Sequence, residues 1–290
     1  MSWRVVVVSK RSKLEYKMNY LVVRDTELLR IHLSEVHTLM IESTAVSLTA
    51  MLIAQLQERK INVIFCDNSR NPLCNVLPFY GCHDSTKKIK MQLAWKQKTK
   101  DAVWVRLVQE KIRNQAKLLL SISPERADIL FEYATRVEEK DATNREAHAA
   151  RVYFNTLFGS AFSRKHESLT NAALNYGYTI ILSAINREIV TNGYLTQLGI
   201  FHDNMFNEFN LSSDLIEPLR PLIDKEVLSW GEIKEFTSSE KMKLVDVLNG
   251  KVTINGKQHH FLQGLEIFCR SIFDALTKDD PDVIQWIEYG

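Results

Sequence analysis

The fold is decided by residues 168–190, SLTNAALNYGYTIILSAINREIV, a long and mostly apolar stretch. Its length and apolar character predict a helix that is buried on most sides, because a surface helix would carry one polar face. A helix of this kind is typical of the centre of a helical domain. We therefore expect the neighbouring segments to pack around it.

The segments on both sides of this stretch also show helical periodicity. The apolar residues of residues 87–120 recur on one side, and Pro124 marks the start of the next helix. Near the end of the chain, residues 251–257, KVTINGK, carry an Asn-Gly pair between alternating residues and predict a small hairpin. The helices expected in this part span residues 87–120, 125–139, 144–158, 168–190 and 262–276.

The pattern before residue 87 is different. Residues 3–8, WRVVVV, are rich in β-branched side chains and predict a first strand. More short strand candidates follow at regular spacing, which is typical of a small β-sandwich or barrel. Turn-forming residues between 68 and 78 indicate a domain boundary. The strand candidates are 14–16, 20–24, 29–33, 38–41 and 62–67, with an amphipathic helix at 45–59.

The sequence therefore predicts an α+β protein built from two domains. A small β-rich domain occupies residues 1–75, a linker spans 76–86, and a larger all-helical domain occupies 87–290. The composition is ordinary for a globular protein, with 45% hydrophobic and 25% charged residues.

Two further patterns concern the cellular location. No apolar run approaches the length of a membrane span, and Val5–Val8 is too short for the core of a signal peptide. The four cysteines, at positions 66, 74, 82 and 269, lack the spacing of a zinc site, which favours a reducing compartment. We expect a cytoplasmic protein with no membrane segment.

The charged residues are unevenly distributed, although the net charge is only +2. Residues 83–126 hold eleven Lys or Arg against four Asp or Glu. A basic helical surface of this kind suits the phosphate backbone of a nucleic acid. The alternative is an ordinary solvated helix face. The basic residues include Lys87, Lys88, Lys90, Lys96, Lys98 and Lys100.

Candidate chemistry centres on residues 197–224, QLGIFHDNMFNEFNLSSDLIEPLRPLID. Asp214 and Glu217 are three residues apart, so on a helix both carboxylates would lie on one face. In the 144–158 helix, alanines beside Glu146 leave room for a hydrated cation or a phosphate. Together with His202, the two glutamates form a set of two acids and one imidazole, which suits Mg²⁺ or Mn²⁺.

Each of these residues also has a structural interpretation. Glu146 could be a surface residue, His202 could cap the preceding helix, and Glu217 could be a first-turn acid stabilised by the helix dipole. His202 and Asp203 also form an HD pair, as in helical metal phosphohydrolases. That fold needs further histidines, for which the nearby candidates are His148 and His166.

Four motifs, taken in order, resemble one family. They are REAHAARVYF at 145–154, NAALNYGYTI at 171–180, LGIFH at 198–202 and DLIEPLRPLID at 214–224. Together they closely resemble the Cas1 family, the integrases of CRISPR adaptation, and the resemblance covers nearly the whole chain. KIRNQAKLL at 111–119 is similar to the variant that accompanies type II systems.

The resemblance implies a homodimeric, metal-dependent DNA integrase and endonuclease. In the family, short duplex DNA fragments are inserted into a repeat array when a 3′-hydroxyl attacks a phosphodiester. The resemblance also implies a small dimeric partner, Cas2, flanked by two integrase dimers. Residues 1–75 would then be a dimerisation domain and residues 87–290 the catalytic, metal- and DNA-binding domain.

The resemblance also implies residue roles. The metal ligands would be Glu146, His202 and Glu217, with Asp214 as an auxiliary acid, and the metal would be Mg²⁺ or Mn²⁺. Ala147 stands where the family often has glycine, a small change beside the ligand. The residues expected to contact double-stranded DNA or to orient the ligands are Tyr153, Arg164, Asn171, Asn175, Arg220, Lys87, Lys88 and Lys90. The alternatives are an HD-type phosphohydrolase and a non-catalytic DNA-binding scaffold.

Overall fold

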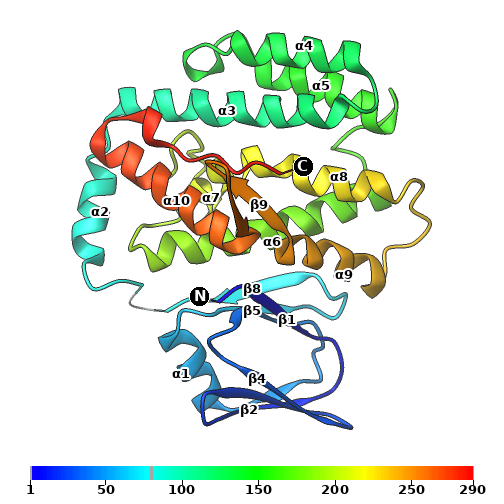
Figure 1. Ribbon diagram of the computed structural model, residues 1–290, viewed down its shortest axis with the longest axis vertical. Coiled ribbons are helices and arrows are strands. Elements are labelled where there is room, and N and C mark those ends of the chain that lie inside the picture. Colours follow the sequence, from blue (N-terminus) through cyan, green and yellow to red (C-terminus); the bar gives the residue numbers. More distant parts are fainter. Residues whose placement is uncertain (1, 79–80, 290) are drawn as a thin grey trace.

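The computed structural model describes residues 2–78 and 81–289 and has the predicted α+β architecture. Figure 1 shows the N-terminal sheets at one end of the molecule and the helices stacked above them. The long helix expected around residues 168–190 is present as α6 (Leu169–Thr191), which begins at the cap residue Ser168. It contacts both a sheet of the N-terminal part and several helices, so it joins the two parts.

The strands within residues 2–78 form two four-stranded sheets. In the first sheet, the three strands β1, β5 and β7 are parallel, and β8 pairs antiparallel with β7. The order of this sheet is β1 (Arg4–Val8), β5 (Val36–Ile41), β7 (Asn62–Cys66), β8 (Pro72–Val76). The order of the second sheet is β4 (Leu28–His32), β3 (Tyr20–Arg24), β2 (Lys13–Lys17), β6 (Ser47–Leu48).

The first sheet is buried on both faces, which explains its continuous runs of valine and isoleucine. Alternate side chains such as Val6, Leu39 and Val63 pack into a core with the second sheet and α1 (Ala50–Glu58). Side chains on the other face, such as Met40 and Ile64, belong to the helical core. The β-rich part is therefore attached to the helices through a shared sheet.

Three secondary-structure predictions in the first half of the chain differ from the structure. The predicted turn cluster at 68–78 contains β8, an edge strand, and an edge position tolerates its proline. The helix expected from residue 45 begins at Ala50, because Ser47 and Leu48 pair with β2. The helix expected over 87–120 is two helices, α2 (Ser85–Leu93) and α3 (Gln97–Leu119). Between them the buried Trp95 packs against Tyr194, with ring centroids 5.5 Å apart.

The remaining elements agree with the predicted periodicity more closely. The predicted hairpin is present, and its turn residues Asn255 and Gly256 have φ of 49° and 74°. The helices here are α4 (Pro124–Thr135), α5 (Arg145–Phe158), α7 (Asn210–Leu215), α8 (Arg220–Ser229), α9 (Ser238–Asp246) and α10 (Phe261–Lys278). The hairpin is β9 (Lys251–Ile254) and β10 (Lys257–His260), and the short 3₁₀ turns are η1 (Glu139–Asp141), η2 (Glu217–Leu219), η3 (Val247–Asn249) and η4 (Pro281–Val283).

In the described part of the chain, no helix combines the length and the apolar character needed to cross a membrane.

Helices α6 and α8 pack closely against each other. Gly177 on α6 faces Ile223 on α8, and a Cβ at Gly177 would be 2.5 Å from Ile223 Cγ2. The two helix backbones approach this closely only because residue 177 has no side chain.

We predict that Gly177→Ala lowers the free energy of unfolding by about 1–3 kcal/mol, because overpacking outweighs the better helix propensity of alanine. The measurement is denaturant unfolding of the two proteins. The same substitution in an Ile223→Ala background should cost much less, since the clashing side chain is gone. Equal costs in both backgrounds would contradict this account of the crossing.

Candidate active site

A buried carboxylate, Asp214, organises the loop that carries His202. Its oxygens accept hydrogen bonds from the backbone N–H groups of Ile200, Phe201 and His202, at 2.6, 3.2 and 3.1 Å. A Cβ at Gly199 would meet His202 O at 2.2 Å and Asp214 Oδ2 at 2.8 Å. Glycine is therefore required for the loop to turn this tightly around the carboxylate.

The same carboxylate orients the imidazole of His202. His202 Nδ1 lies 2.6 Å from Asp214 Oδ1. Since a carboxylate accepts, Nδ1 carries the proton, and in the neutral ring Nε2 keeps its lone pair for a ligand. The hydrogen bond to Asp214 raises the pKa of His202, although burial opposes the shift.

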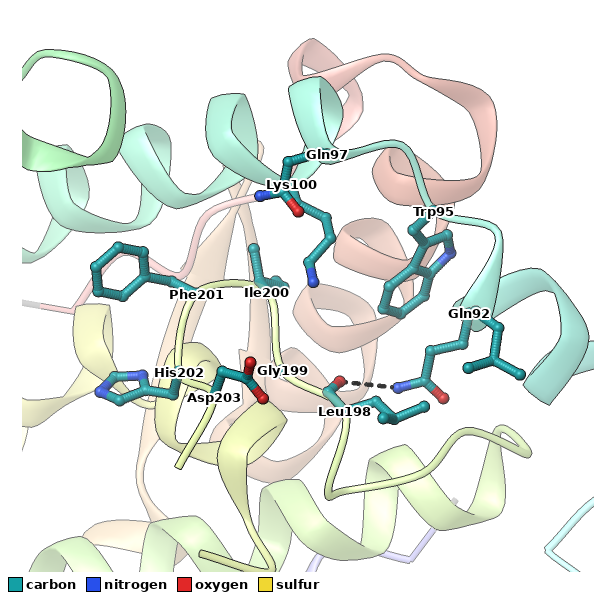
Figure 2. Close-up of a pocket in the computed structure, with 11 residues that line it drawn as sticks. Gln92, Trp95, Gln97, Lys100, Leu198, Gly199, Ile200, Phe201, His202 and Asp203 are labelled. Atoms are coloured by element: carbon teal, nitrogen blue, oxygen red, sulfur yellow. Dashed lines mark hydrogen bonds between the residues drawn. The ribbon is translucent and has the colours of Figure 1, made fainter. Parts of the chain in front are cut away.

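Aromatic side chains flank this imidazole. The rings of Trp104 and Phe201 stack with centroids 4.4 Å apart and planes 3° apart, and Trp104 meets His202 edge-on at 5.6 Å. Figure 2 shows His202 and Asp203 beside Phe201 among the residues that line one cavity. The volume of that cavity is about 430 Å³, and Trp95 and Lys100 also contribute to its lining.

The two glutamates converge on a single cation, the ammonium of Lys111. Lys111 Nζ lies 2.6 Å from Glu146 Oε1 and 2.5 Å from Glu217 Oε2. The first contact is a hydrogen bond, and the second is an ion pair. Three distant segments meet here: the middle of α3, the first turn of α5 and the start of η2.

Glu217 stays ionised although it is buried. Burial raises the pKa of its carboxyl, but the nearby charges of Arg220 and Lys111 outweigh burial and lower it to about 2. Arg220 Nε donates to Glu217 Oε1 at 2.9 Å. Burial also disfavours the charged form of Lys111 and so lowers its pKa, but the charges of Glu217 and Glu146 outweigh burial and raise it. The set consists of two carboxylates and two cations.

A third buried acid lies on the other side of Arg220. Asp224 accepts hydrogen bonds from the hydroxyls of Tyr153, at 2.9 Å, and of Tyr178. The guanidinium carbon of Arg220 lies 4.6 Å from the centre of the Tyr178 ring, a cation-π contact. Burial raises the pKa of Asp224 to about 6 despite the two hydroxyl donors. A cavity of about 220 Å³ is lined by this acid together with Lys111, Arg164 and Glu217.

The sequence matches the family described as CRISPR associated protein Cas1 over residues 5–246. The chain belongs to the Cas1 family. A protein of Neisseria meningitidis serogroup C (strain 8013), named CRISPR-associated endonuclease Cas1, is 31% identical over 301 residues, covering 100% of this chain and 99% of that relative. The family predicted from the four motifs is thus confirmed.

Solved structures confirm the fold. A chain of a Cas6-RT-Cas1–Cas2 complex superposes with a TM-score of 0.76 at 19% identity, covering 99% of this chain and 36% of that longer chain. A casposase bound to integration product superposes with a TM-score of 0.74 at 18% identity, covering 97% of this chain and 92% of the casposase. At such low identities the likeness concerns the fold of this Cas1 protein.

The fit of a divalent metal to this Cas1 protein can be judged from its carboxylates. Among residues 2–78 and 81–289, no group of three or more His, Cys, Asp or Glu is arranged to hold a metal ion. Glu146 and Glu217 nevertheless approach one cation from two sides, and, after the larger effect of Asp214, their charges also favour a raised pKa of His202. Oxygen donors of this kind suit Mg²⁺ or Mn²⁺. The three-residue ligand set stays a prediction.

Asp214 and Glu217 have separate partners in the structure. Asp214 lies at the end of α7 and faces the His202 loop, whereas Glu217 begins η2 and faces Lys111 and Arg220. They belong to different hydrogen-bond systems, and the three-residue spacing does not make them a pair.

Two of the predicted asparagines contact Arg164. Arg164 donates to Asn171 and, at 2.6 Å, to Asn175. Asn171 also donates to the backbone carbonyls of Ser163 and His166, at 2.8 and 2.7 Å, which is a packing role. These hydrogen bonds hold the side chain of Arg164, which lines the small cavity, in place.

The predicted lysines lie elsewhere. The helix α2, at the left edge of Figure 1, carries Lys87, Lys88 and Lys90. The ion pairs of Lys111 with Glu146 and Glu217 are formed by other elements. The ammonium of Lys88 lies 5.6 Å from the Tyr194 ring.

Sequence reasoning missed the roles of Lys111 and Asp224. A signal for Lys111 was available, because it lies three and four residues after Val108 and Leu107, on the side of the helix that is otherwise apolar. A lysine there needs a buried partner. Asp224 gave no comparable signal, because its tyrosine partners are 46 and 71 residues away.

We predict that Asp224 makes stability depend on pH. Its pKa is raised to about 6, above the ordinary value of 3.8 for an aspartate, so the stability that it contributes below pH 4 is lost as the pH rises through about 6. The loss is about 3 kcal/mol. Asp224→Asn removes this titration, so relative to the variant the wild-type free energy of unfolding should fall by that amount between pH 4 and 7.

The measurement is chemical denaturation of both proteins across this pH range. Asp128→Asn, at an exposed position on α4, serves as the control and should follow the wild-type profile. A constant difference between Asp224→Asn and wild type at every pH would show that Asp224 does not titrate there.

Proposed function

We propose that this Cas1 protein is a divalent-metal-dependent DNA integrase of CRISPR adaptation, with the endonuclease activity that the resemblance implies. It inserts short duplex fragments into a repeat array by attack of a 3′-hydroxyl on a phosphodiester. The observation that supports this most is the convergence of Glu146 and Glu217 on one cation position. The imidazole of His202, oriented by Asp214, would supply the third ligand.

The proposal assigns a task to each residue. Glu146, His202 and Glu217 hold Mg²⁺ or Mn²⁺, which when bound neutralises charge developing on the phosphodiester. Asp214 keeps His202 in one tautomer and one orientation. Arg220 balances the charge of Glu217 and, with Arg164, places two guanidinium groups at the small cavity, where a phosphate would be recognised.

Partners follow from the family and from the described structures. One fold relative is described as part of a complex containing Cas2, and another as bound to an integration product. We extend both features to this chain, which would bind double-stranded DNA and a small dimeric Cas2 partner. We also propose that the chain forms a homodimer through its β-rich part, residues 1–75.

The described contacts of His148 and His166 do not support the alternative of an HD-type phosphohydrolase. His148 is placed beside Tyr133, with ring centroids 6.5 Å apart. His166 contributes its backbone carbonyl to Asn171. Neither contact brings a second imidazole to the His202–Asp203 pair.

We predict that Glu146→Gln, His202→Ala and Glu217→Gln each reduce strand transfer below about 1% of wild type, because each removes a proposed metal ligand. The assay joins a short duplex with free 3′-hydroxyls to a plasmid carrying a repeat, with Cas2 and with Mg²⁺, Mn²⁺ or EDTA. DNA binding, measured in parallel, should stay largely intact.

The control is Glu132→Gln, because Glu132 is an exposed acid on α4 that pairs with Arg136 one turn away on the same helix. It should join DNA at the wild-type rate. Circular dichroism confirms that each variant is folded. A variant that keeps wild-type joining removes its residue from the ligand set, and joining in EDTA would refute the metal dependence.

We also predict that the lysines of α2 contact the DNA backbone. Replacing Lys87, Lys88 and Lys90 together by Gln should weaken DNA binding and reduce the slope of log affinity against log salt by up to about 3. A matched triple variant of Lys10, Lys13 and Lys17, exposed on the β-rich part, should change the slope less. Equal slopes for the α2 variant and wild type would make α2 an ordinary solvated helix.

A further inference from the structure

The position between Glu146 and Glu217 is already held by a positive charge from the chain itself. Lys111 Nζ lies 2.6 Å from one carboxylate and 2.5 Å from the other. We propose that Lys111 is an internal counter-cation that occupies the metal position and must leave it when the divalent ion binds. This inference rests on the proposed function, in which the same two glutamates are metal ligands.

The charges at the site require such an exchange. In the ion-paired state two carboxylates, Glu146 and Glu217, are balanced by two cations, Lys111 and Arg220. A divalent ion between the same carboxylates would add two positive charges next to an ammonium in contact with both. The repulsion is strong in a buried site, because there is little water to screen it. The ammonium therefore has to move before the ion can bind.

The backbone of Lys111 cannot move with it. Lys111 lies in the middle of α3, with the buried residues Leu107, Val108 and Ile112 one turn away or adjacent. Only its flexible four-carbon side chain can change conformation. Its side chain is 11% exposed, so the ammonium is held by its two partners and not by bulk water.

An adjacent open volume can receive the displaced ammonium. Lys111 itself lines the cavity of about 220 Å³, together with Gln115 and Arg164. The guanidinium groups of Arg164 and Arg220 also line this cavity, so a rotated ammonium would be stabilised there by the carboxylate of Asp224 and the amide of Gln115. The side chain thus has two places available to it from one backbone position.

A purely structural ion pair would behave differently. Lys117, two turns further along α3, pairs with Glu110 Oε1 at 3.6 Å and donates to Asn114 Oδ1 at 3.0 Å. It contacts neither Glu146 nor Glu217 and is the matched control. Removing an ammonium that only supports the fold should not strengthen metal binding.

The experiment measures Mn²⁺ binding to the full chain without DNA, by electron paramagnetic resonance of free Mn²⁺. Lys111→Met removes the charge and keeps the length of the side chain, so we expect Mn²⁺ to bind about tenfold tighter or more than to wild type. Lys117→Met should bind Mn²⁺ as wild type does. Unchanged or weaker affinity in Lys111→Met would overturn the proposal.

A second measurement uses the wild-type chain and does not depend on the folding of a variant. Acetic anhydride labelling, followed by mass spectrometry, reports how accessible each lysine is. Mn²⁺ should increase the labelling of Lys111 severalfold relative to Lys117, because the ammonium leaves its ion pairs. Labelling of Lys111 that is unchanged or decreased by Mn²⁺ would overturn the exchange.

Failure of this inference can be told apart from failure of the proposed function. Glu146→Gln should abolish Mn²⁺ binding in the wild-type and Lys111→Met backgrounds alike. If Mn²⁺ binds, depends on Glu146 and shows the same affinity with Lys111→Met, only the counter-cation proposal fails. If neither wild type nor Lys111→Met binds Mn²⁺, the carboxylate pair is not a metal site and both proposals fail.

Discussion

The burial of negative charge is the constraint on which this structure depends. Asp214, Glu217 and Asp224 lie within eleven residues of one another, and each is at most 4% exposed. A buried carboxylate is costly unless it is paired or hydrogen-bonded, so each of the three must find partners from another part of the chain. Asp214 uses backbone N–H groups, Glu217 uses two cations and Asp224 uses two hydroxyls. Folding of this segment therefore requires α3, α5 and α6 to be in place.

Two prolines interrupt the helix that would otherwise carry these carboxylates. Pro218 and Pro221 remove backbone donors, and the chain forms the short elements α7, η2 and α8 instead of one helix. At this interruption the carbonyl of Pro218 accepts hydrogen bonds from Asn114 Nδ2 at 3.0 Å and from Tyr289 Oη at 2.7 Å. The interruption of the helix is thus stabilised by tertiary hydrogen bonds.

The parts of the fold that depend on local pattern could be predicted from the sequence. The α6 helix and the Asn-Gly hairpin follow from periodicity and turn chemistry alone. The break at Trp95 could not be predicted, because it depends on a ring contact with Tyr194. The candidate site was likewise predicted only in part. Motifs indicated the acids and His202, whereas the contacts of Lys111 with Glu146 and Glu217 join residues 35 and 106 positions apart and exist only in the folded chain.

The three ways of satisfying a carboxylate differ in how easily they can be exchanged. The partners of Asp214 include three backbone N–H groups, which cannot leave without unfolding the loop, so His202 has a fixed orientation. The partner shared by Glu146 and Glu217 is the end of a flexible lysine side chain, which can leave while the helix stays intact. A rigid support for one proposed ligand therefore lies beside a replaceable charge on the two other proposed ligands. This division suits the proposed metal site, which would fold without its metal and still accept it, because the carboxylates would be neutralised in both states.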